Sequence, residues 1–539
     1  MTRPSHGRRL PADHLGAVLS EAAVPIVVGL VIGGALLLCL RRRRLRWTWA
    51  LFMVPLVCGA WLVDRHAGLG IATAAVVAGL FGAQLHLDAI GKGGEEARLA
   101  REAIGPFVAL RSLIAERGAR RDPRRAGTVA IGRTARGGIC RVPMGGPGAG
   151  RHVLVPGATG GGKTTSKATL LDAHVDAGMA GLIVDPKRDP RLLASAEAAA
   201  AASVVPFRLW SPSGSLVYNP LAHGDPDEVA DKALSAHEFS EPHYEMATRR
   251  LLGLVLTTMK AAGVWPPTLS SLVEYMHLDR LDALADRAGG EMAEQVHSYV
   301  DGLDARGRAD LRGGRDRLAV LAESELGRRL DPARGDGAEL DLRRALARGE
   351  AVYFSLEADR YPIAARLLTA ALVMDLASLA SGWQGSGKAA IVLIDEFGSV
   401  VTPQVSRLLA RCRGAGISLV MGVQSLSDLR GVGAGEDTLL EQVISNVTYV
   451  LAHRIPDPDS AEHLARMAGT EPAWTRTEQM GGGLFSSPQG AATRKRERDF
   501  VIGPDAFKRL GPGEAIVIQP TAAPPAEVVS IWPPRHGGE

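Results

Sequence analysis

Residues 157–164 combine glycines with one lysine and one threonine, in the order Gly157-Ala158-Thr159-Gly160-Gly161-Gly162-Lys163-Thr164. Glycines at this spacing let backbone N–H groups point at the oxygens of a bound phosphate. We expect Lys163 to reach the β- and γ-phosphates of ATP, and the Thr164 hydroxyl to bind Mg²⁺. The pattern predicts an ATP site made of these residues and Thr165.

The sequence on either side fits a phosphate-binding loop. Val153–Val155 is a short apolar run typical of a buried strand, and Ser166–Ala177 has the pattern of a helix. A loop between a strand and a helix is the context that this motif requires, because the helix N-terminus favours an anion.

A second motif lies more than two hundred residues further on. Ile391–Ile394 is a continuous apolar run, as expected for a strand buried in a parallel sheet, and Asp395 and Glu396 follow it directly. Acidic residues at the carboxyl end of such a strand lie at the ligand-binding edge of the sheet. We expect Asp395 to orient Mg²⁺ and Glu396 to polarise the water that attacks ATP.

Two further polar groups are candidates for ATP hydrolysis. Gln424 follows the apolar run Ile417–Val423, where its side chain could sense the γ-phosphate. Arg411 and Arg413 precede that run, and ring ATPases place such an arginine against the nucleotide of the neighbouring subunit. We favour Arg413, although a surface arginine at a helix end is nearly as good an interpretation.

Strand and helix signals alternate around these motifs. Gly181–Val184, which ends in Asp185-Pro186-Lys187, and Val447–Ala452 complete the expected strands. The alternation predicts an α/β fold with a mostly parallel central sheet covered on both faces. The helical pattern of residues 225–342 predicts an inserted all-α domain.

The N-terminal region is strongly apolar. Runs at residues 22–40, 47–63 and 67–85 approach the length needed to cross a bilayer, and arginines cluster at 41–46. A signal peptide fits poorly, because no small-residue cleavage site precedes the arginines. Keeping these arginines in the cytoplasm puts the N-terminus outside, so three spans return the chain to the cytoplasm and are preferred to two.

The expected division of the chain is as follows: a membrane region at 1–90, a cytoplasmic connector at 91–126, a nucleotide-binding domain in two parts at 127–224 and 343–519 around the insertion at 225–342, and a Pro-rich tail at 520–539. Glu514–Ile518 is expected to be an edge strand. Gly481–Thr493 is expected to be a mobile loop, and the basic Arg494–Arg498 a solvated turn rather than a nucleic-acid contact.

Composition adds little to these expectations. The formal net charge is +4, which gives no global sign of a polyanionic partner. The four cysteines have no metal-ligand spacing, so we expect no metal other than Mg²⁺ bound with the nucleotide.

Taken in order, four segments resemble the coupling ATPases of type IV secretion and conjugation, the TraD/TraG group. They are His152–Thr164, Leu182–Lys187, Ala390–Phe397 and Gly416–Leu429, and the resemblance extends over roughly residues 128–518. It implies a RecA-like P-loop motor and a homo-hexamer in the inner membrane, multi-pass, with its ATPase domain in the cytoplasm. By similarity, Lys163, Thr164, Asp395, Glu396, Arg413 and Gln424 carry ATP hydrolysis.

The implied cargo is DNA, single-stranded and joined to a relaxase, which such proteins hand to a type IV secretion channel. The insertion would correspond to the family's all-α domain, which helps to select substrate. Most members have two spans around a periplasmic loop, and this sequence departs from them with three.

Three other classes of protein remain as alternatives. An FtsK-like translocase of double-stranded DNA is disfavoured by the helical insertion between the Gly181 and Asp395 strands. A secretion ATPase that moves polypeptide stays open, because no base-reading residues are visible in the sequence. A non-hydrolysing membrane scaffold is disfavoured by Lys163, Asp395 and Glu396.

Overall fold

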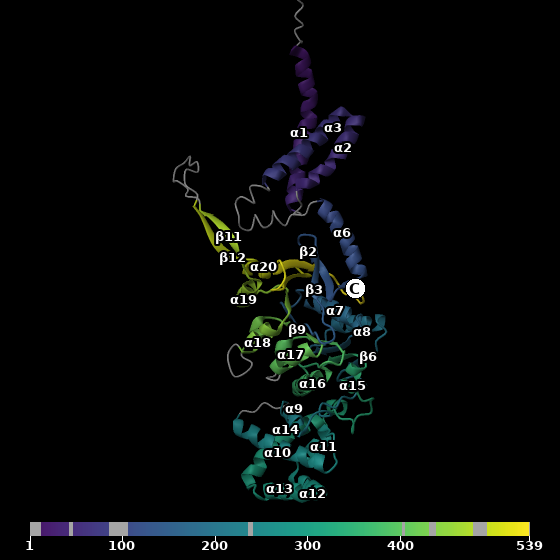
Figure 1. The fold of residues 1–539 in the computed structure, drawn as a ribbon, viewed down its shortest axis with the longest axis vertical. Helices are drawn as coiled ribbons and strands as arrows, with labels where there is room; N and C mark the ends of the chain where they lie inside the picture. Colours follow the sequence, from purple (N-terminus) through teal and green to yellow (C-terminus); the bar gives the residue numbers. More distant parts are fainter. Residues whose placement is uncertain are drawn as a thin grey trace, which may run out of the picture. The chain divides into compact units, whose positions relative to one another are not determined.

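The structure is a computed structural model that describes residues 12–42, 47–85, 106–235, 241–400, 405–430, 438–477 and 493–537. These residues fall into two compact units, of which the larger comprises residues 122–132, 140–469 and 502–539. The α/β class predicted from the sequence is confirmed by the mixed, mostly parallel sheet at the centre of the larger unit (Figure 1).

The sheet has twelve strands in the order β1-β2-β14-β13-β10-β4-β9-β8-β5-β7-β6, with β3 paired to β2. Their bounds are β1 (Arg124–Arg125), β2 (Thr128–Thr134), β3 (Ile139–Pro143), β4 (Val153–Pro156), β5 (Ala180–Asp185), β6 (Phe207–Trp210), β7 (Ala351–Ser355), β8 (Ala390–Ile394), β9 (Ile417–Val423), β10 (Tyr449–Ala452), β13 (Glu514–Ile518) and β14 (Ala526–Ile531). The strands from β10 to β6 are parallel, whereas β13 runs antiparallel to both β10 and β14.

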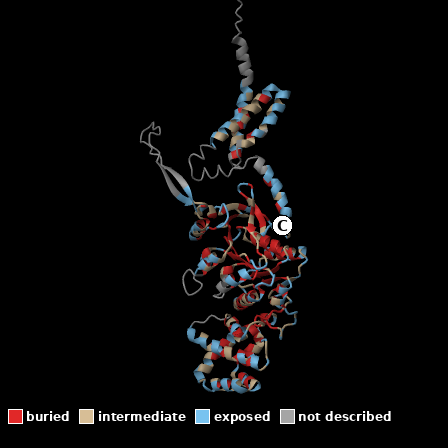
Figure 2. Ribbon diagram, viewed as in Figure 1, coloured by how far each residue is buried: buried red, intermediate tan, exposed pale blue. Residues whose placement is uncertain are grey.

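The parallel strands are almost continuously apolar because both faces of the sheet are covered. All residues of β8 and β9 are buried, and so are those of β4 and β5. The covering helices are α7 (Lys163–Val175), α8 (Pro190–Ala202), α16 (Pro362–Trp383), α17 (Val405–Gly414), α18 (Thr438–Asn446), α19 (Pro458–Ala468) and α20 (Pro504–Lys508). Figure 2 shows that buried residues are concentrated in this part of the chain.

The segment between β6 and β7 contains helices and one isolated β-bridge, between Val217 and Glu339, among its described residues. The helices are α9 (Pro226–Leu234), α10 (Pro242–Ala261), α11 (Leu269–Tyr275), α12 (Leu278–Ala288), α13 (Gly290–Asp301), α14 (Ala305–Glu323) and α15 (Leu342–Ala347). Within the larger unit, α10 to α14 group together away from the sheet (Figure 1).

The C-terminal part of the sheet differs from the expectation. Glu514–Ile518 was expected to be an edge strand, but β13 lies between β10 and β14. The second partner is β14, in a segment whose prolines predicted only a tail. In β14, Val529 and Ile531 are buried on one face, whereas Val528 and Ser530 on the other face are half-buried and exposed, as in a strand that turns one face to the core.

Residues 494–498 also differ from the expectation. They were expected to form a solvated turn, but they lie in β12 (Thr493–Phe500), which pairs antiparallel with β11 (Thr470–Thr477) in a separate two-stranded sheet. The mobile loop expected at 481–493 lies outside the described residues except for Thr493. Residues 106–121 of the connector form the helix α6 (Pro106–Arg121).

The N-terminal apolar runs form helices. They are α1 (Ala12–Arg42), a 3₁₀ segment η1 (Trp47–Phe52), α2 (Met53–Val63), α3 (Arg65–Val76) and a π-helical segment η2 (Val77–Phe81). Ala23–Leu40 and Arg65–Leu85 are long and apolar enough to cross a membrane, and Thr48–Val63 is apolar but shorter. Large apolar side chains on these helices are exposed, Leu38 by 70% and Leu62 by 88%, as in helices that face lipid.

A third helix is also long and apolar enough to cross a membrane. It is α16, but two thirds of this helix is buried inside the fold, and it packs on α9, α15 and α17. The helix is therefore part of the core of the larger unit rather than an exposed apolar segment.

Candidate nucleotide-binding site

Strand order brings the predicted motifs to one edge of the sheet. Pro156 at the end of β4 pairs with Val423 at the end of β9, so Gly157 and Gln424 leave the sheet side by side. Ile394 of β8 pairs with both Met421 of β9 and Val184 of β5. The acidic motif is thus separated from the loop by β9, whose last residue leads directly into Gln424.

Two glycines of the loop are required by its geometry. Gly162, the residue before α7, has φ of 108°, which favours glycine. A Cβ at Gly157 would lie 2.7 Å from the Cβ of His453. Lys163 donates a hydrogen bond to the Gly157 carbonyl, which closes the loop on itself. Burial, and the nearby charge of Lys167, lower the pKa of Lys163.

The other predicted nucleotide-binding residues lie between β4 and the first turn of α7. Ala158 donates from its N–H to the Arg454 carbonyl at 2.8 Å and accepts from Gly161 N–H at 3.2 Å. Gly160 has φ of 77°, and Thr159 lies before it in the loop. Thr165 is in the first turn of α7, where its carbonyl accepts from the Thr169 hydroxyl.

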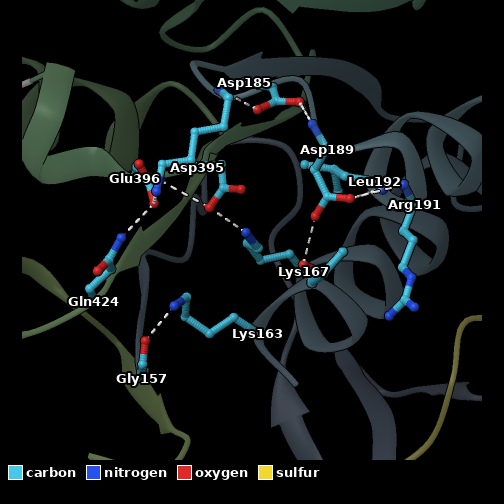
Figure 3. Close-up of polar contacts among 12 residues, drawn as sticks. Gly157, Lys163, Lys167, Asp185, Asp189, Arg191, Leu192, Asp395, Glu396 and Gln424 are labelled. Atoms are coloured by element: carbon cyan, nitrogen blue, oxygen red, sulfur yellow. Dashed lines mark hydrogen bonds and ion pairs between the residues drawn. The ribbon is translucent and has the colours of Figure 1, made fainter. Parts of the chain in front are cut away.

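Thr164 is linked to the next helix through Asp189. Its hydroxyl donates to Asp189 Oδ2 at 2.9 Å, while Asp189 Oδ1 caps α8 by accepting from the N–H groups of Arg191 and Leu192 (Figure 3). Asp189 is itself held by Asp185 at the end of β5, which accepts from its N–H at 2.6 Å. The β5 turn therefore positions the hydroxyl that we predicted as a Mg²⁺ ligand.

Asp185 organises that turn from a buried position. It accepts from the N–H groups of Lys187 and Arg188, and from the hydroxyl of Tyr353 on β7 at 2.5 Å. Burial raises the pKa of Asp185, although these hydrogen bonds oppose the shift. The Asp185-Pro186-Lys187 motif thus gives a fixed turn that presents Lys187 toward the β8 edge.

Asp395 forms a buried ion pair with Lys167, one helical turn after Lys163 on α7. The Lys167 side chain is 1% exposed and that of Asp395 11%. Asp395 Oδ1 also accepts from the Glu396 N–H at 3.0 Å.

Glu396 is held by two side chains. Gln424 donates to its Oε1 at 2.8 Å, and Lys187 forms an ion pair with the same oxygen. Glu396 has φ of 51°, a left-handed conformation that strains a residue other than glycine by about 1 kcal/mol or more. Figure 3 shows Glu396 between Gln424 and Asp395, opposite the P-loop lysine.

His453 packs against the phosphate-binding loop. Its Nδ1–H donates to the Glu514 carbonyl at 2.9 Å, so Nε2 is the acceptor for the Ser166 hydroxyl, also at 2.9 Å. Burial lowers the pKa of His453 to about 4, which keeps the ring neutral at pH 7. It directly follows β10, the strand beside β4, which explains why a Cβ at Gly157, Gly161 or Gly162 would lie within 3.4 Å of it.

Arg413 is not brought to this cluster within one chain. Arg411 and Arg413 are both exposed in the last turn of α17, and the Arg413 carbonyl accepts from Gly150 N–H at 2.8 Å. Among the described residues, the Arg413 side chain has no hydrogen-bond or ion-pair partner.

Sequence reasoning missed Lys167, Lys187, Asp189 and His453. Lys167 gave one signal, since it lies four residues after Lys163 and so on the same helix face. Asp189 gave another, since an aspartate before Pro190 is a typical helix cap. Nothing local to His453 points to the loop, because their contact depends on the pairing of β10 with β4.

Chemically, the edge combines a phosphate-binding lysine with hydroxyl and carboxylate oxygens. Thr164 and Asp395 supply the hard oxygen ligands that Mg²⁺ prefers, and Glu396 is a carboxylate within reach of a polar amide. This donor set fits a magnesium-bound nucleoside triphosphate.

Part of the chain is similar to known proteins. Residues 390–512 match the family model described as the TraM recognition site of TraD and TraG. An uncharacterized protein of Mycoplasma pneumoniae is 29% identical over 86 residues, 16% of this chain and 56% of that protein. The chain thus spans about half the length of that curated relative.

Several solved structures share the fold. The unbound bacterial conjugative coupling protein TrwB has a TM-score of 0.55 at 17% identity, covering 78% of this chain and 92% of that chain. TrwB in complex with the ATP analogue ADPNP gives 0.54 at 19%, covering 77% and 92%. TrwB with ADP and Mg²⁺ gives 0.54 at 19%, covering 78% and 93%. The chain is therefore similar to TraD and TraG over residues 390–512, and it has the fold of the coupling protein TrwB.

Proposed function

We propose that this chain is a membrane-anchored P-loop ATPase that couples ATP hydrolysis to the transfer of DNA, or of a relaxase–DNA complex, through a type IV secretion or conjugation system. One observation carries the proposal: a P-loop, Asp395 and Glu396 meet at one sheet edge in a chain whose residues 390–512 match TraD and TraG. TrwB structures with ADPNP, and with ADP and Mg²⁺, support the choice of nucleotide and metal.

In this proposal the loop binds the phosphates of ATP through its backbone N–H groups and Lys163. Thr164 and Asp395 hold Mg²⁺, which supplies positive charge to the phosphate oxygens. Asp189 orients the Thr164 hydroxyl from the α8 cap. Residues 157–162 and Thr165 complete the nucleotide-binding set.

Hydrolysis requires a water aligned with the γ-phosphate. Glu396 is the residue that polarises this water, and Gln424 positions the Glu396 carboxylate and senses the γ-phosphate. Arg413 acts on the nucleotide of a neighbouring subunit. Its exposure at the end of α17, apart from the cluster of its own chain, supports a role in trans.

The proposed setting is the inner membrane, as a multi-pass protein that assembles into a homo-hexamer. The helices Ala23–Leu40 and Arg65–Leu85, with the shorter Thr48–Val63, are the spans. Arg41–Arg46 stays in the cytoplasm, which puts the N-terminus outside and the nucleotide-binding domain inside.

The Lys163→Ala variant tests the ATPase assignment. ATP hydrolysis by the detergent-solubilised chain should fall to background, because the lysine that binds the terminal phosphates is gone, while membrane insertion is kept. Lys260→Ala, at an exposed position on α10, is the matched control and should keep wild-type turnover. Undiminished hydrolysis in Lys163→Ala would overturn the assignment.

The cargo is tested by stimulation of the ATPase. Single-stranded DNA should raise turnover of the wild-type chain more than duplex DNA of the same length does, and added salt should weaken the effect because phosphate contacts release counterions. Stimulation by duplex alone would indicate a double-stranded DNA translocase. Stimulation by polypeptide alone would indicate a protein-secretion ATPase.

A further inference from the structure

Lys167 is a buried cation that the proposed hydrolysis mechanism does not use. It follows Lys163 by one turn of α7, so both ammonium groups extend from the same face of the helix. Lys167 is 1% exposed, and its ion-pair partner is Asp395. A buried ammonium is stable only beside an opposite charge, so the two residues form one unit.

The neighbouring strand leaves room for this pair. Gly422 is the second-last residue of β9, where it pairs with Val155 of β4, and a glycine weakens a strand unless something approaches closely. A Cβ at Gly422 would lie 3.0 Å from Asp395 Oδ1 and 3.5 Å from Lys167 Cδ. Even alanine at position 422 would therefore crowd the Asp395 carboxylate, which Figure 3 shows beside Lys167.

The positive charge of Lys167 affects titratable groups at the proposed phosphate site. It is the second cause of the lowered pKa of Lys163, after burial. It also contributes to the lowered pKa of His453 beneath the loop. A negative charge at the same place would act on these groups with similar strength and the opposite sign. The sign of the charge around Asp395 therefore matters for the binding of a polyanion.

We propose that Lys167 is a second cation of the phosphate site, which neutralises Asp395 so that the chain binds the phosphates of ATP before Mg²⁺ arrives. The inference rests on the proposed function only in taking ATP as the ligand. Without Lys167, the Asp395 carboxylate repels the phosphates until Mg²⁺ neutralises it. Lys167 is thus a positioning and charge-balancing residue rather than a catalytic one.

The test measures ATP binding, not turnover. Isothermal titration calorimetry of the detergent-solubilised full chain at pH 8 gives the Kd for ATP in EDTA and in Mg²⁺. The Kd in EDTA divided by the Kd in Mg²⁺ isolates the contribution of the metal. Lys167→Met should raise this ratio about tenfold or more, the effect of one uncompensated unit charge within about 8 Å at an effective dielectric constant of about 20. An unchanged ratio, including an equal loss of affinity under both conditions, overturns the inference.

A double variant separates charge from packing. Lys167→Met with Asp395→Asn replaces a neutral ion pair by a neutral pair of similar volume. Its Kd in EDTA should return to within about threefold of wild type, as expected when no unit charge is left uncompensated. A loss that persists in the double variant attributes the effect to packing and overturns the inference.

The chain contains a matched control for losing a buried lysine. Lys232 on α9 and Asp375 on α16 form another ion pair, 2.7 Å long, with both side chains 1% exposed. Lys232→Met should leave the ratio of the two Kd values unchanged within twofold, and a tenfold rise there overturns the inference. Wild-type protein that fails to bind ATP even with Mg²⁺ would instead contradict the proposed function.

Discussion

Glu396 combines a strained backbone with a side chain that Gln424 and Lys187 hold. Its left-handed φ persists because Asp395, immediately before it, is fixed by Lys167, and because Lys187 and Gln424 hold the carboxylate. Strain of this kind is maintained where the surrounding structure over-determines a residue. The geometry is therefore consistent with a carboxylate that must be held in one place to act on water.

Replacing Glu396 by Gln should trap bound ATP. The amide keeps the size of the side chain but cannot accept a proton from water, so hydrolysis should fall at least about 100-fold while ATP affinity stays within a few-fold. Single-turnover hydrolysis and ATP titration measure the two effects. Glu357→Gln is the matched control, because Glu357 is another glutamate with a positive φ, 47°. This variant should hydrolyse ATP at the wild-type rate. Rapid hydrolysis by Glu396→Gln would show that water is activated elsewhere.

At the residue scale, the sequence predicted what local motifs encode. Gly157–Thr164, Asp395 and Glu396 were readable because each follows an apolar run with the right polar types. Lys187 and Lys167 could not be assigned a partner, since their carboxylates come from β8, more than two hundred residues away. Pairing them requires the strand order β4-β9-β8-β5, which hydrophobic pattern alone does not give.

Among the elements, the N-terminal helices pack through glycines. A Cβ at Gly33 of α1 would lie 2.9 Å from the Ala74 carbonyl oxygen of α3, and one at Gly29 would lie 2.3 Å from that of Gly70. Small residues four apart allow two helices to approach closely in a membrane, where packing rather than water drives their association. Gly34, one residue on, has nothing within 4 Å of such a Cβ.

Gly33→Leu should therefore separate α1 from α3. We expect a lower midpoint of thermal unfolding in detergent, by several degrees, and less protein in the membrane fraction. Gly34→Leu adds the same side chain one position away, where space is open, and should match wild type. Equal behaviour of the two variants would show that the close approach of the helices contributes nothing to stability.

Buried histidines connect the elements of the core. His152, before β4, accepts at Nδ1 from the Leu419 N–H of β9 and donates from Nε2 to the Leu409 carbonyl of α17 at 2.8 Å. His174, near the end of α7, donates to the Leu170 carbonyl at 2.7 Å. Burial lowers the pKa of each to about 4, from 6.5.

These shifts predict acid sensitivity. Below about pH 6.5 these histidines bind protons in the unfolded chain but stay neutral in the folded chain. The free energy of unfolding therefore decreases as the pH falls from 6.5 toward 4. Each histidine contributes a decrease of up to about 1.4 kcal/mol per pH unit. Thermal midpoints between pH 7.5 and 5 measure the slope, which His174→Gln should reduce. His243→Gln, at a side chain 71% exposed, should not. An unaltered slope in His174→Gln would contradict the prediction.

Elements with strong local signals were predictable, and those defined by long-range pairing were not. β5, β8 and β9 follow the apolar runs closely, because a fully buried strand must be apolar throughout. β14 was missed because its flanking prolines suggested a tail. It becomes a strand only through its pairing with β13.

At the scale of the whole molecule, one chain holds an incomplete set of the proposed catalytic groups. Lys163, Asp395, Glu396 and Gln424 converge, but Arg413 is exposed at the far end of α17 from the residues that would bind phosphate. An arginine that neutralises transition-state charge must come close to the γ-phosphate. In the proposed ring, each subunit supplies Arg413 to its neighbour, which meets both conditions.

Mixing two inactive variants tests that arrangement. Arg413→Ala keeps a complete P-loop but lacks the arginine, while Lys163→Ala lacks the P-loop lysine but keeps Arg413. If Arg413 acts in trans, mixed assemblies contain interfaces where an intact P-loop meets an intact Arg413, so ATPase activity should reappear. It should reach its maximum near equal amounts, at about a quarter of the wild-type rate when assembly is random, since a rate set by transition-state contacts requires both groups at one interface.

Arg411→Ala mixed with Lys163→Ala is the matched control, because both arginines are exposed in the same helical turn. If Arg413 is the residue in trans, Arg411→Ala is active alone and mixing with Lys163→Ala gains nothing. No recovery at any ratio for Arg413→Ala, with both proteins shown to co-assemble, would assign this arginine to its own chain or to none.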